Sequence, residues 1–373
     1  MNRYDIAIIG AGPAGASAAL SAVRGGARAV IIEKQPLPRP KLCGGWVAHR
    51  ALRMLEFPLG EDVIEHRFDT VDLRDGTRGV RYVAPEGLGV FVDRAIFDAH
   101  LIAAAESAGA ALLTAKVTAV QRDGAGINLM TTAGAVWAGG VILCAGANSG
   151  LIRALRAPDP PGRFGVALEQ RLPVEYAAPL EVMPGTARLE FGRIPYGYGW
   201  VLHHGPYLVV GIGGRRASAG SLRAHYRDFW NHLRLPAALI APRGHPLPVG
   251  GFRRVLDRGR ILAAGDAAGF VDAFTGEGIT HAIHSGQLAA LSLLRSTDDE
   301  AGRDYRRRCA VSILPELRDS LRMARLFHTA PRFFRQTFCG DPAAAQRFAA
   351  VVEGKLTYKK YLAWAVARRL RLV

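Results

Sequence analysis

A glycine-rich turn near the N-terminus limits this chain to a small set of folds. Gly10-Ala11-Gly12-Pro13-Ala14-Gly15 follows a β-branched run at residues 5–9 and leads into an alanine-rich stretch, 16–24. A second β-branched run, 29–32, ends on Glu33. Strand, GxGxxG turn, helix, strand and acidic residue within one βαβ length are typical of a Rossmann-type unit. The sequence therefore predicts an α/β fold with a parallel sheet and a dinucleotide at this turn.

The residue types in this turn each have a physical role in holding a pyrophosphate. Gly10 permits the tight turn, Gly12 lets the backbone approach the phosphates, and Gly15 lets the helix pack closely on the strand. The start of that helix offers unpaired N–H groups and a partial positive charge to the phosphates. Glu33 stands where a carboxylate can accept hydrogen bonds from ribose hydroxyls, which argues against NADP at this site. The turn alone does not distinguish FAD from NAD.

A second glycine-and-acid motif, far along the chain, distinguishes these two cofactors. Gly265-Asp266 follows the strand-like residues 260–263, and Gly276-Glu277-Gly278-Ile279 then leads into a helical stretch. A carboxylate in this position can hold a ribityl hydroxyl, and the glycine-rich helix start can direct N–H groups at the electron-rich side of a flavin. Here the chain resembles flavoproteins built like para-hydroxybenzoate hydroxylase, and Val92-Asp93-Arg94 resembles them too. The motifs together predict FAD.

Three further stretches resemble the geranylgeranyl reductase family: Pro40-Lys41-Leu42-Cys43-Gly44-Gly45, the segment 265–279, and Pro195-Tyr196-Gly197-Tyr198-Gly199-Trp200. The resemblance covers roughly residues 1–295. It implies an FAD-dependent oxidoreductase that reduces carbon–carbon double bonds of an isoprenoid (geranylgeranyl-type) lipid, quinone or pigment precursor by hydride transfer from flavin N5. It also implies the cofactor-binding residues, which are Gly10, Gly12, Pro13, Ala14, Gly15, Glu33, Lys34, Cys43, Gly44, Gly45, Arg94, Val117, Gly146, Gly265, Asp266, Gly276, Gly278 and Ile279.

The same resemblance indicates which residues carry the chemistry. An isolated isoprenoid alkene is a poor hydride acceptor, so alignment and proton transfer matter. Cys43 is the leading candidate for the proton donor, and the alternative is a small thiol that only packs. Tyr198 and Trp200 are expected to line an apolar substrate cavity, with Tyr198 as a secondary donor; the alternative is that both are core aromatics.

The chain also departs from its family patterns. Val201-Leu202-His203 stands where the family continues with Phe-Pro, which predicts a reshaped substrate cavity. Ala145 replaces the aspartate of a segment that aromatic hydroxylases use for FAD and pyridine nucleotide, so the electron donor stays open between NAD(P)H and a ferredoxin-like protein. Two alternative functions remain. One is a flavin-dependent monooxygenase or halogenase acting on an aromatic or lipophilic substrate, and the other is a flavin-binding accessory protein without turnover.

The motifs predict how the chain is organised. We expect a glutathione-reductase-like FAD-binding domain assembled from residues 1–68, 90–165 and 250–300. A β-rich substrate domain is expected from 69–89 and 166–249. Residues 301–373 form a helical, basic C-terminal region, which Pro315, Pro331 and Pro342 break into segments.

The charge and the cysteines indicate the expected partners and cellular location of such a protein. Of the formal net charge of +16, residues 301–373 supply +11, with 16 Lys and Arg against 5 Asp and Glu. These basic residues alternate with apolar ones, as in Tyr358-Lys359-Lys360-Tyr361-Leu362-Ala363-Trp364, so peripheral contact with an anionic membrane and a solvated basic face are both open. No nucleic-acid motif accompanies the charge, which argues against nucleic acid as a partner.

Four cysteines lack CxxC or metal-ligand spacing, which predicts a reducing, cytoplasmic compartment and no metal site. No apolar run approaches the roughly 18–20 residues of a membrane span. Contact with the inner face of the membrane would therefore be peripheral.

Overall fold

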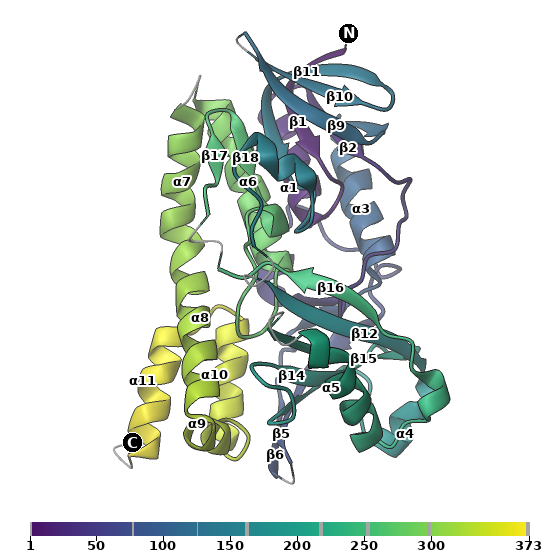
Figure 1. Ribbon diagram of the computed structural model, residues 1–373, viewed down its shortest axis with the longest axis vertical. Coiled ribbons are helices and arrows are strands. Elements are labelled where there is room, and N and C mark those ends of the chain that lie inside the picture. Colours follow the sequence, from purple (N-terminus) through teal and green to yellow (C-terminus); the bar gives the residue numbers. More distant parts are fainter. Residues whose placement is uncertain are drawn as a thin grey trace.

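The computed structural model describes residues 2–76, 78–124, 126–160, 164–215, 219–250, 254–296 and 300–370. One large sheet lies at the top of Figure 1 and a second lies below it, while the C-terminal helices run down one side of both. The strand order, helix positions and sheet type confirm the predicted α/β fold class with a Rossmann-type sheet and a helical C-terminal region.

The upper sheet is built on the N-terminal βαβ unit. Strand β1 pairs in parallel with β2 and β11, and the described strands follow the order β17-β18-β11-β1-β2-β8, with β9 and β10 as an antiparallel extension beside β11. Ile6, Ile8 and Ile9 are buried in its centre because helices cover its face. The strands are β1 (Asn2–Ile9), β2 (Ala29–Glu33), β8 (Ala111–Thr114), β9 (Val117–Asp123), β10 (Gly126–Thr131), β11 (Gly134–Leu143), β17 (Asp257–Arg258) and β18 (Ile261–Ala263). The covering helices are α1 (Pro13–Arg24), α3 (Arg94–Ser107) and α6 (Ile279–Arg295), and α1 packs on both others.

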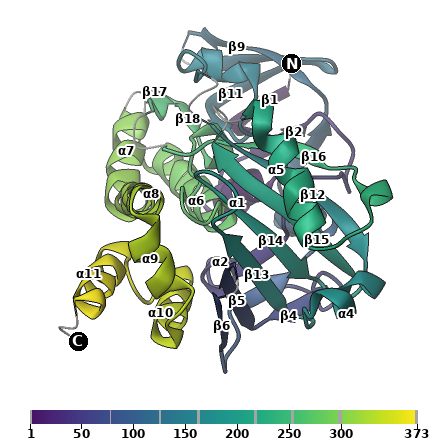
Figure 2. The same cartoon turned by 60° about the horizontal axis from the view of Figure 1, so that its bottom comes forward.

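The lower sheet is antiparallel apart from one pair. Its described strands follow the order β16-β12-β15-β14-β13-β5-β6, and only β13 and β5 pair in parallel. The strands are β5 (Thr70–Asp75), β6 (Arg78–Val83), β12 (Gly165–Pro173), β13 (Thr186–Phe191), β14 (Tyr198–His203), β15 (Tyr207–Arg215) and β16 (Arg243–Leu247). Helix α5 (Ala219–His232) covers one face (Figure 2), where Tyr226, Phe229 and Trp230 pack against Val210 and Ile212. The opposite face is turned toward the cavity and the C-terminal helices.

Short elements connect the two sheets. A small antiparallel sheet contains β3 (Trp46–Ala48), β4 (His66–Phe68) and β7 (Gly89–Phe91) in the order β3-β7-β4, and α2 (His49–Leu52) and α4 (Ala177–Leu180) are single helical turns. Four 3₁₀ turns are described at Gly150–Ala154, Val174–Tyr176, Ala237–Leu239 and Gly265–Ala267. The proposed domain limits stay a prediction; among the described residues, 69–89 and 166–249 include the strands of the lower sheet apart from Gly165, the first residue of β12.

The described C-terminal residues form helices, of which α7 packs beside the upper sheet and the later ones pack against the lower sheet. They are α7 (Glu300–Ser312), α8 (Leu314–Thr329), α9 (Pro331–Phe338), α10 (Pro342–Val352) and α11 (Tyr358–Arg369). Pro315, Pro331 and Pro342 each sit in the first turn of a helix, where a missing N–H costs nothing. Phe191 of the sheet packs against Phe327 and Phe338, so helices and sheet share one apolar core. No helix in the described ranges is both long and apolar enough to span a bilayer.

Candidate functional site

A cavity of about 1750 Å³ lies between the two sheets and the C-terminal helices. Pockets for a single small molecule are typically about 300–1,000 Å³, so this cavity has room for more than one. It is lined by all of the residues predicted at the cofactor and substrate except Gly15: Gly10, Gly12, Pro13, Ala14, Glu33, Lys34, Cys43, Gly44, Gly45, Arg94, Val117, Gly146, Tyr198, Trp200, Gly265, Asp266, Gly276, Gly278 and Ile279. Motifs more than 250 residues apart therefore meet in one space.

The three glycines of the N-terminal turn have different surroundings. A Cβ on Gly15 would lie 1.9 Å from the Gly10 carbonyl oxygen, so Gly15 allows α1 to pack against the turn. Gly10 has φ +111°, and its Cβ would lie 2.5 Å from the Cys144 carbonyl oxygen. At Gly12 the nearest atom to a Cβ is the Arg39 Nη2 at 3.9 Å, so the space above it is open to a ligand.

Glu33 lies at the end of β2, where it was predicted to meet a ribose. Its Oε2 accepts a hydrogen bond of 2.8 Å from the Ala11 N–H, which fixes the carboxylate beside the glycine turn. Arg39 approaches the same carboxylate, with Nε 3.3 Å from Glu33 Oε2 but without the angle of a hydrogen bond. The Arg39 Nε is buried and has no hydrogen-bond partner in the described part of the chain.

Arg39 is a residue that the sequence interpretation missed. It lines the cavity over Gly12, and its Nη1 is 3.4 Å from the buried carboxylate of Asp98. A guanidinium held between two carboxylates and turned toward a phosphate turn is suited to a diphosphate. Arg39 stands in Pro38-Arg39-Pro40, which has no motif spacing, so no sequence signal could have identified it.

The Cys43 turn contributes several charged groups to the cavity. Arg94 donates to Asp98 through Nε (2.8 Å) and Nη2 (3.0 Å), and it also hydrogen-bonds to Cys43. Lys41 Nζ lies 2.7 Å from His245 Nε2. Burial lowers the pKa of Lys41 even though Asp266 opposes that shift.

Glu169 is a second residue that sequence reasoning did not single out. It lies on β12, lines the cavity and is only 4% exposed, and its carboxylate receives the Cys43 backbone N–H. Burial raises the pKa of Glu169 to about 7, with the charges of Arg171 and Lys41 acting in the opposite direction. A carboxyl group of this kind can hold or release a proton near neutral pH. Glu169 lies in a strand without a motif, so only the fold brings it to Cys43.

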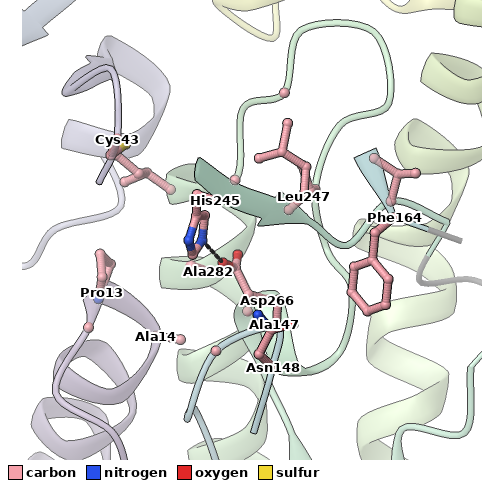
Figure 3. A pocket seen from close by; sticks show the side chains of 18 of the residues that line it. Pro13, Ala14, Cys43, Ala147, Asn148, Phe164, His245, Leu247, Asp266 and Ala282 are labelled. Atoms are coloured by element: carbon pink, nitrogen blue, oxygen red, sulfur yellow. Dashed lines mark ion pairs between the residues drawn. The ribbon is translucent and has the colours of Figure 1, made fainter. Parts of the chain in front are cut away.

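Asp266 faces the same region from the end of the upper sheet. Its Oδ2 lies 3.8 Å from His245 Nε2. Figure 3 shows these two side chains pointing toward each other, with Cys43 on the other side of the cavity. Burial acts to raise the pKa of Asp266, but His245 and the positive charges of Lys41 and Arg94 outweigh it and hold the pKa below its ordinary value. Asp266 is therefore an ionised acceptor for a ligand hydroxyl.

Tyr198 and Trp200 lie on β14 and line the cavity from the lower sheet. The Tyr198 hydroxyl donates to the Thr275 carbonyl, and burial raises its pKa well above the usual value. The Trp200 ring lies against Gly211, where a Cβ would be 2.3 Å from it, and its Nε1 has no hydrogen-bond partner among the described residues. Glycine on the neighbouring strand thus makes room for this ring.

Residues of the C-terminal helices complete the apolar wall, a role that the sequence did not predict for them. They are Leu321 and Ala324 of α8, Phe348, Val351 and Val352 of α10, and Tyr358 of α11. The Tyr358 hydroxyl donates to the buried Asp272 Oδ2 at 2.9 Å, and Asp272 Oδ1 accepts the N–H groups of Phe274 and Thr275. The helices are therefore bonded directly to the loop before Gly276.

The residues present fit FAD. The open space over Gly12, the unsatisfied Arg39 Nε, the Glu33 carboxylate and the ionised Asp266 supply the groups that a dinucleotide with a ribityl chain requires. In the described ranges, no three His, Cys, Asp or Glu side chains gather as a metal ion would need.

Comparison with known proteins agrees with this geometry. A family model described as an FAD binding domain matches residues 5–82. Menaquinone reductase of Mycobacterium tuberculosis is 32% identical over 321 residues, 79% of this chain and 77% of that protein. Geranylgeranyl diphosphate reductase of Rhodobacter capsulatus is 28% identical over 309 residues, 77% of this chain and 74% of that protein.

Solved structures with this fold include a geranylgeranyl bacteriochlorophyll reductase-like protein from Thermoplasma acidophilum. It has a TM-score of 0.78 and 21% identity, covering 99% of this chain and 97% of that chain. A flavin-dependent brominase follows with a TM-score of 0.73 and 17% identity, covering 95% and 94%. At these identities the structures show the fold alone, whereas the sequence relatives cover most of both chains. This chain belongs to the geranylgeranyl reductase family of FAD-dependent oxidoreductases.

Proposed function

We propose that this protein reduces carbon–carbon double bonds in the isoprenoid chain of a lipophilic substrate, which is a lipid, a quinone or a pigment precursor. One observation carries the proposal: the cavity continues from the Cys43 turn into a space walled by aromatic and aliphatic side chains. The names of the relatives support it, since a menaquinone reductase and a geranylgeranyl diphosphate reductase are both similar over most of the chain.

Each part of the cavity has a role in this reaction. Bound and reduced FAD would supply hydride to one carbon of the double bond. Arg39, Glu33 and Asp266 would hold the cofactor, while Trp200 and the C-terminal helices would exclude water and align the chain of the substrate. The second carbon needs a proton, and the Cys43 Sγ is the group that holds it beside Arg94.

The test is anaerobic. The purified flavoprotein is reduced with dithionite and mixed with a geranylgeranyl-bearing quinone or lipid, and flavin reoxidation is followed together with product mass. We expect reoxidation with a gain of two hydrogens, and a large loss of this step in Cys43→Ser with FAD still bound. Flavin that stays reduced until oxygen is admitted, followed by oxygen in the product, would overturn the proposal in favour of a monooxygenase.

The proposal also includes the electron donor and the cellular location of the enzyme. We propose that NAD(P)H or a ferredoxin-like protein reduces the flavin, and that the enzyme meets its lipophilic substrate in the cytoplasm at the inner face of the membrane. The oxidised flavoprotein is mixed anaerobically with NADH, NADPH or reduced ferredoxin, one at a time. The donor is the one that removes the absorbance of the oxidised flavin.

A further inference from the structure

A buried histidine lies directly behind the Cys43 turn. His204 is 1% exposed, and it follows the stretch at which this chain departs from the Phe-Pro of its family. Its Nε2 lies 3.0 Å from the Gly44 carbonyl oxygen and its Nδ1 lies 2.7 Å from Glu65 Oε2. The contact is close: a Cβ on Gly45, which has φ +69°, would lie 2.8 Å from His204 Cε1.

Both ring nitrogens of His204 have a hydrogen-bond partner. A carbonyl oxygen can only accept, so Nε2 carries a hydrogen directed at Gly44. Glu65 accepts the Tyr207 hydroxyl at 2.7 and 2.6 Å from its two oxygens, and burial together with Glu65 holds the pKa of Tyr207 well above its usual range. Glu65 thus holds the His204 ring on one side while the Gly44 carbonyl holds it on the other.

The ring of His204 has no freedom to turn. It is stacked between Phe91 (centroids 4.5 Å apart, 26° between planes) and Tyr207 (4.9 Å, 20°). Arg171 covers Tyr207 at 4.3 Å and pairs with Asp93 at 2.8 Å. His203 and Asp93 are further titratable groups that lie close enough to interact with His204, and His66 interacts with His203.

The turn itself offers two free donors to the cavity. The Gly45 carbonyl accepts the Val92 N–H at 2.9 Å, whereas the N–H groups of Gly44 and Gly45 have no hydrogen-bond partner among the described residues. Both glycines line the cavity. A hydrogen-bond donor on the Gly44 carbonyl polarises the Gly44–Gly45 peptide and strengthens the Gly45 N–H as a donor.

We propose that His204 and Glu65 are a positioning pair that fixes the Gly44 carbonyl and thereby aims Cys43 and the Gly45 N–H at the ligand in the cavity. This inference rests on the proposed function, since it assigns a role at the same site. The pair acts through the turn and does not touch the reacting atoms.

Two substitutions at position 204 separate positioning from packing. His204→Gln keeps an N–H donor near the position of Nε2, while His204→Phe keeps the stacked ring and removes both hydrogen bonds. We expect His204→Phe to lower kcat about tenfold or more with little change in KM, because the hydrogen bond to the Gly44 carbonyl is lost, and His204→Gln to recover most of that loss. His232→Phe is the matched control, because His232 pairs with Glu190 at 2.9 Å and lies outside the cavity lining.

Amide exchange provides a readout that packing alone would not change. In the FAD-bound protein without substrate, the Gly44 and Gly45 amides should exchange faster in His204→Phe than in the wild type. Exchange rates of these two amides that are the same in His204→Phe, His232→Phe and the wild type would overturn the inference. The exchange result stands even if no alkene is reduced, so failure of the proposed function is recognised separately.

Discussion

Gly12 and Gly15 stand three residues apart in one turn, yet a methyl group would meet different neighbours at each. At Gly12 the nearest atom is 3.9 Å away, and at Gly15 a backbone carbonyl is 1.9 Å away. We expect Gly12→Ala to change the free energy of unfolding of the FAD-free protein by no more than about 0.5 kcal/mol. FAD should bind at least about tenfold more weakly, because the methyl group would occupy the space of the phosphates. Thermal unfolding of the apoprotein and a flavin-fluorescence titration measure the two effects.

Gly15→Ala provides the contrast to this variant. Its methyl would force α1 away from the turn, so both the stability of the apoprotein and FAD affinity should fall. Equal stability losses in the two variants would contradict the different roles given to these glycines.

Glu169 gives the stability of the protein a specific dependence on pH. Its pKa is raised by burial from 4.5 to about 7, so the folded state binds more protons than the unfolded state between those values. The stability that this group contributes is present below pH 4.5 and is lost as pH rises through 7. Glu169→Gln should therefore be more stable than wild type at pH 8, by on the order of 3 kcal/mol, with little difference at acidic pH.

Denaturant unfolding of the FAD-free protein at several pH values measures this difference. A pH-independent offset between Glu169→Gln and the wild type would show that the carboxyl titrates normally. The same variant should also retain the Cys43 N–H contact, because the Gln oxygen accepts as the carboxylate does.

At the scale of elements, one hydrogen bond connects α11 to the loop before Gly276. The Tyr358 hydroxyl at the start of α11 donates to the buried Asp272. Tyr358→Phe leaves that carboxylate with one donor fewer, so we expect a loss of about 1–3 kcal/mol in the free energy of unfolding. Tyr361→Phe is the control, since Tyr361 is equally buried on α11 and the tyrosine that donates to Asp272 is Tyr358. Thermal unfolding should show a lower Tm for the first variant only, and equal shifts would contradict this role.

Elements with local signals were the ones that the sequence could predict. The turn 10–15 and its flanking strands are close in sequence, so their spacing alone indicates the βαβ unit that the structure shows. The strand-like patches 165–169 and 207–212 lie in β12 and β15. Helix α5, in contrast, interrupts a region interpreted as strands, and the parallel pairing of β5 with β13 joins segments more than a hundred residues apart. Such pairings depend on burial in the whole sheet.

The same distinction holds for the site at the scale of the molecule. Residues in motifs, such as Asp266 and Cys43, were predicted and line the cavity. Arg39, Glu169 and His204 acquire their roles only through neighbours that folding brings to them, namely Asp98, Cys43 and Glu65. The apolar wall from α8 and α10 was likewise unpredictable, because an aromatic residue in a helix has the same pattern whether it faces a core or a substrate.

The distribution of charge over the whole molecule supports a last prediction, that the protein binds anionic membranes through its C-terminal region. Lys359 and Lys360 are exposed at the start of α11, and Val366 and Leu370 are 40% and 60% exposed further along the chain. Each Lys near an anionic surface contributes about 1 kcal/mol, so reversing both charges in Lys359→Glu/Lys360→Glu should weaken binding to phosphatidylserine vesicles by at least about tenfold. Flotation with these vesicles measures the bound fraction, and added salt should lower it because it screens exposed charges.

Arg223→Glu/Arg227→Glu makes the same change in charge on exposed positions of α5 and should leave binding close to that of the wild type. Binding that both double variants reduce equally would point to net charge rather than to this helix, and absence of binding by the wild type would exclude the membrane contact.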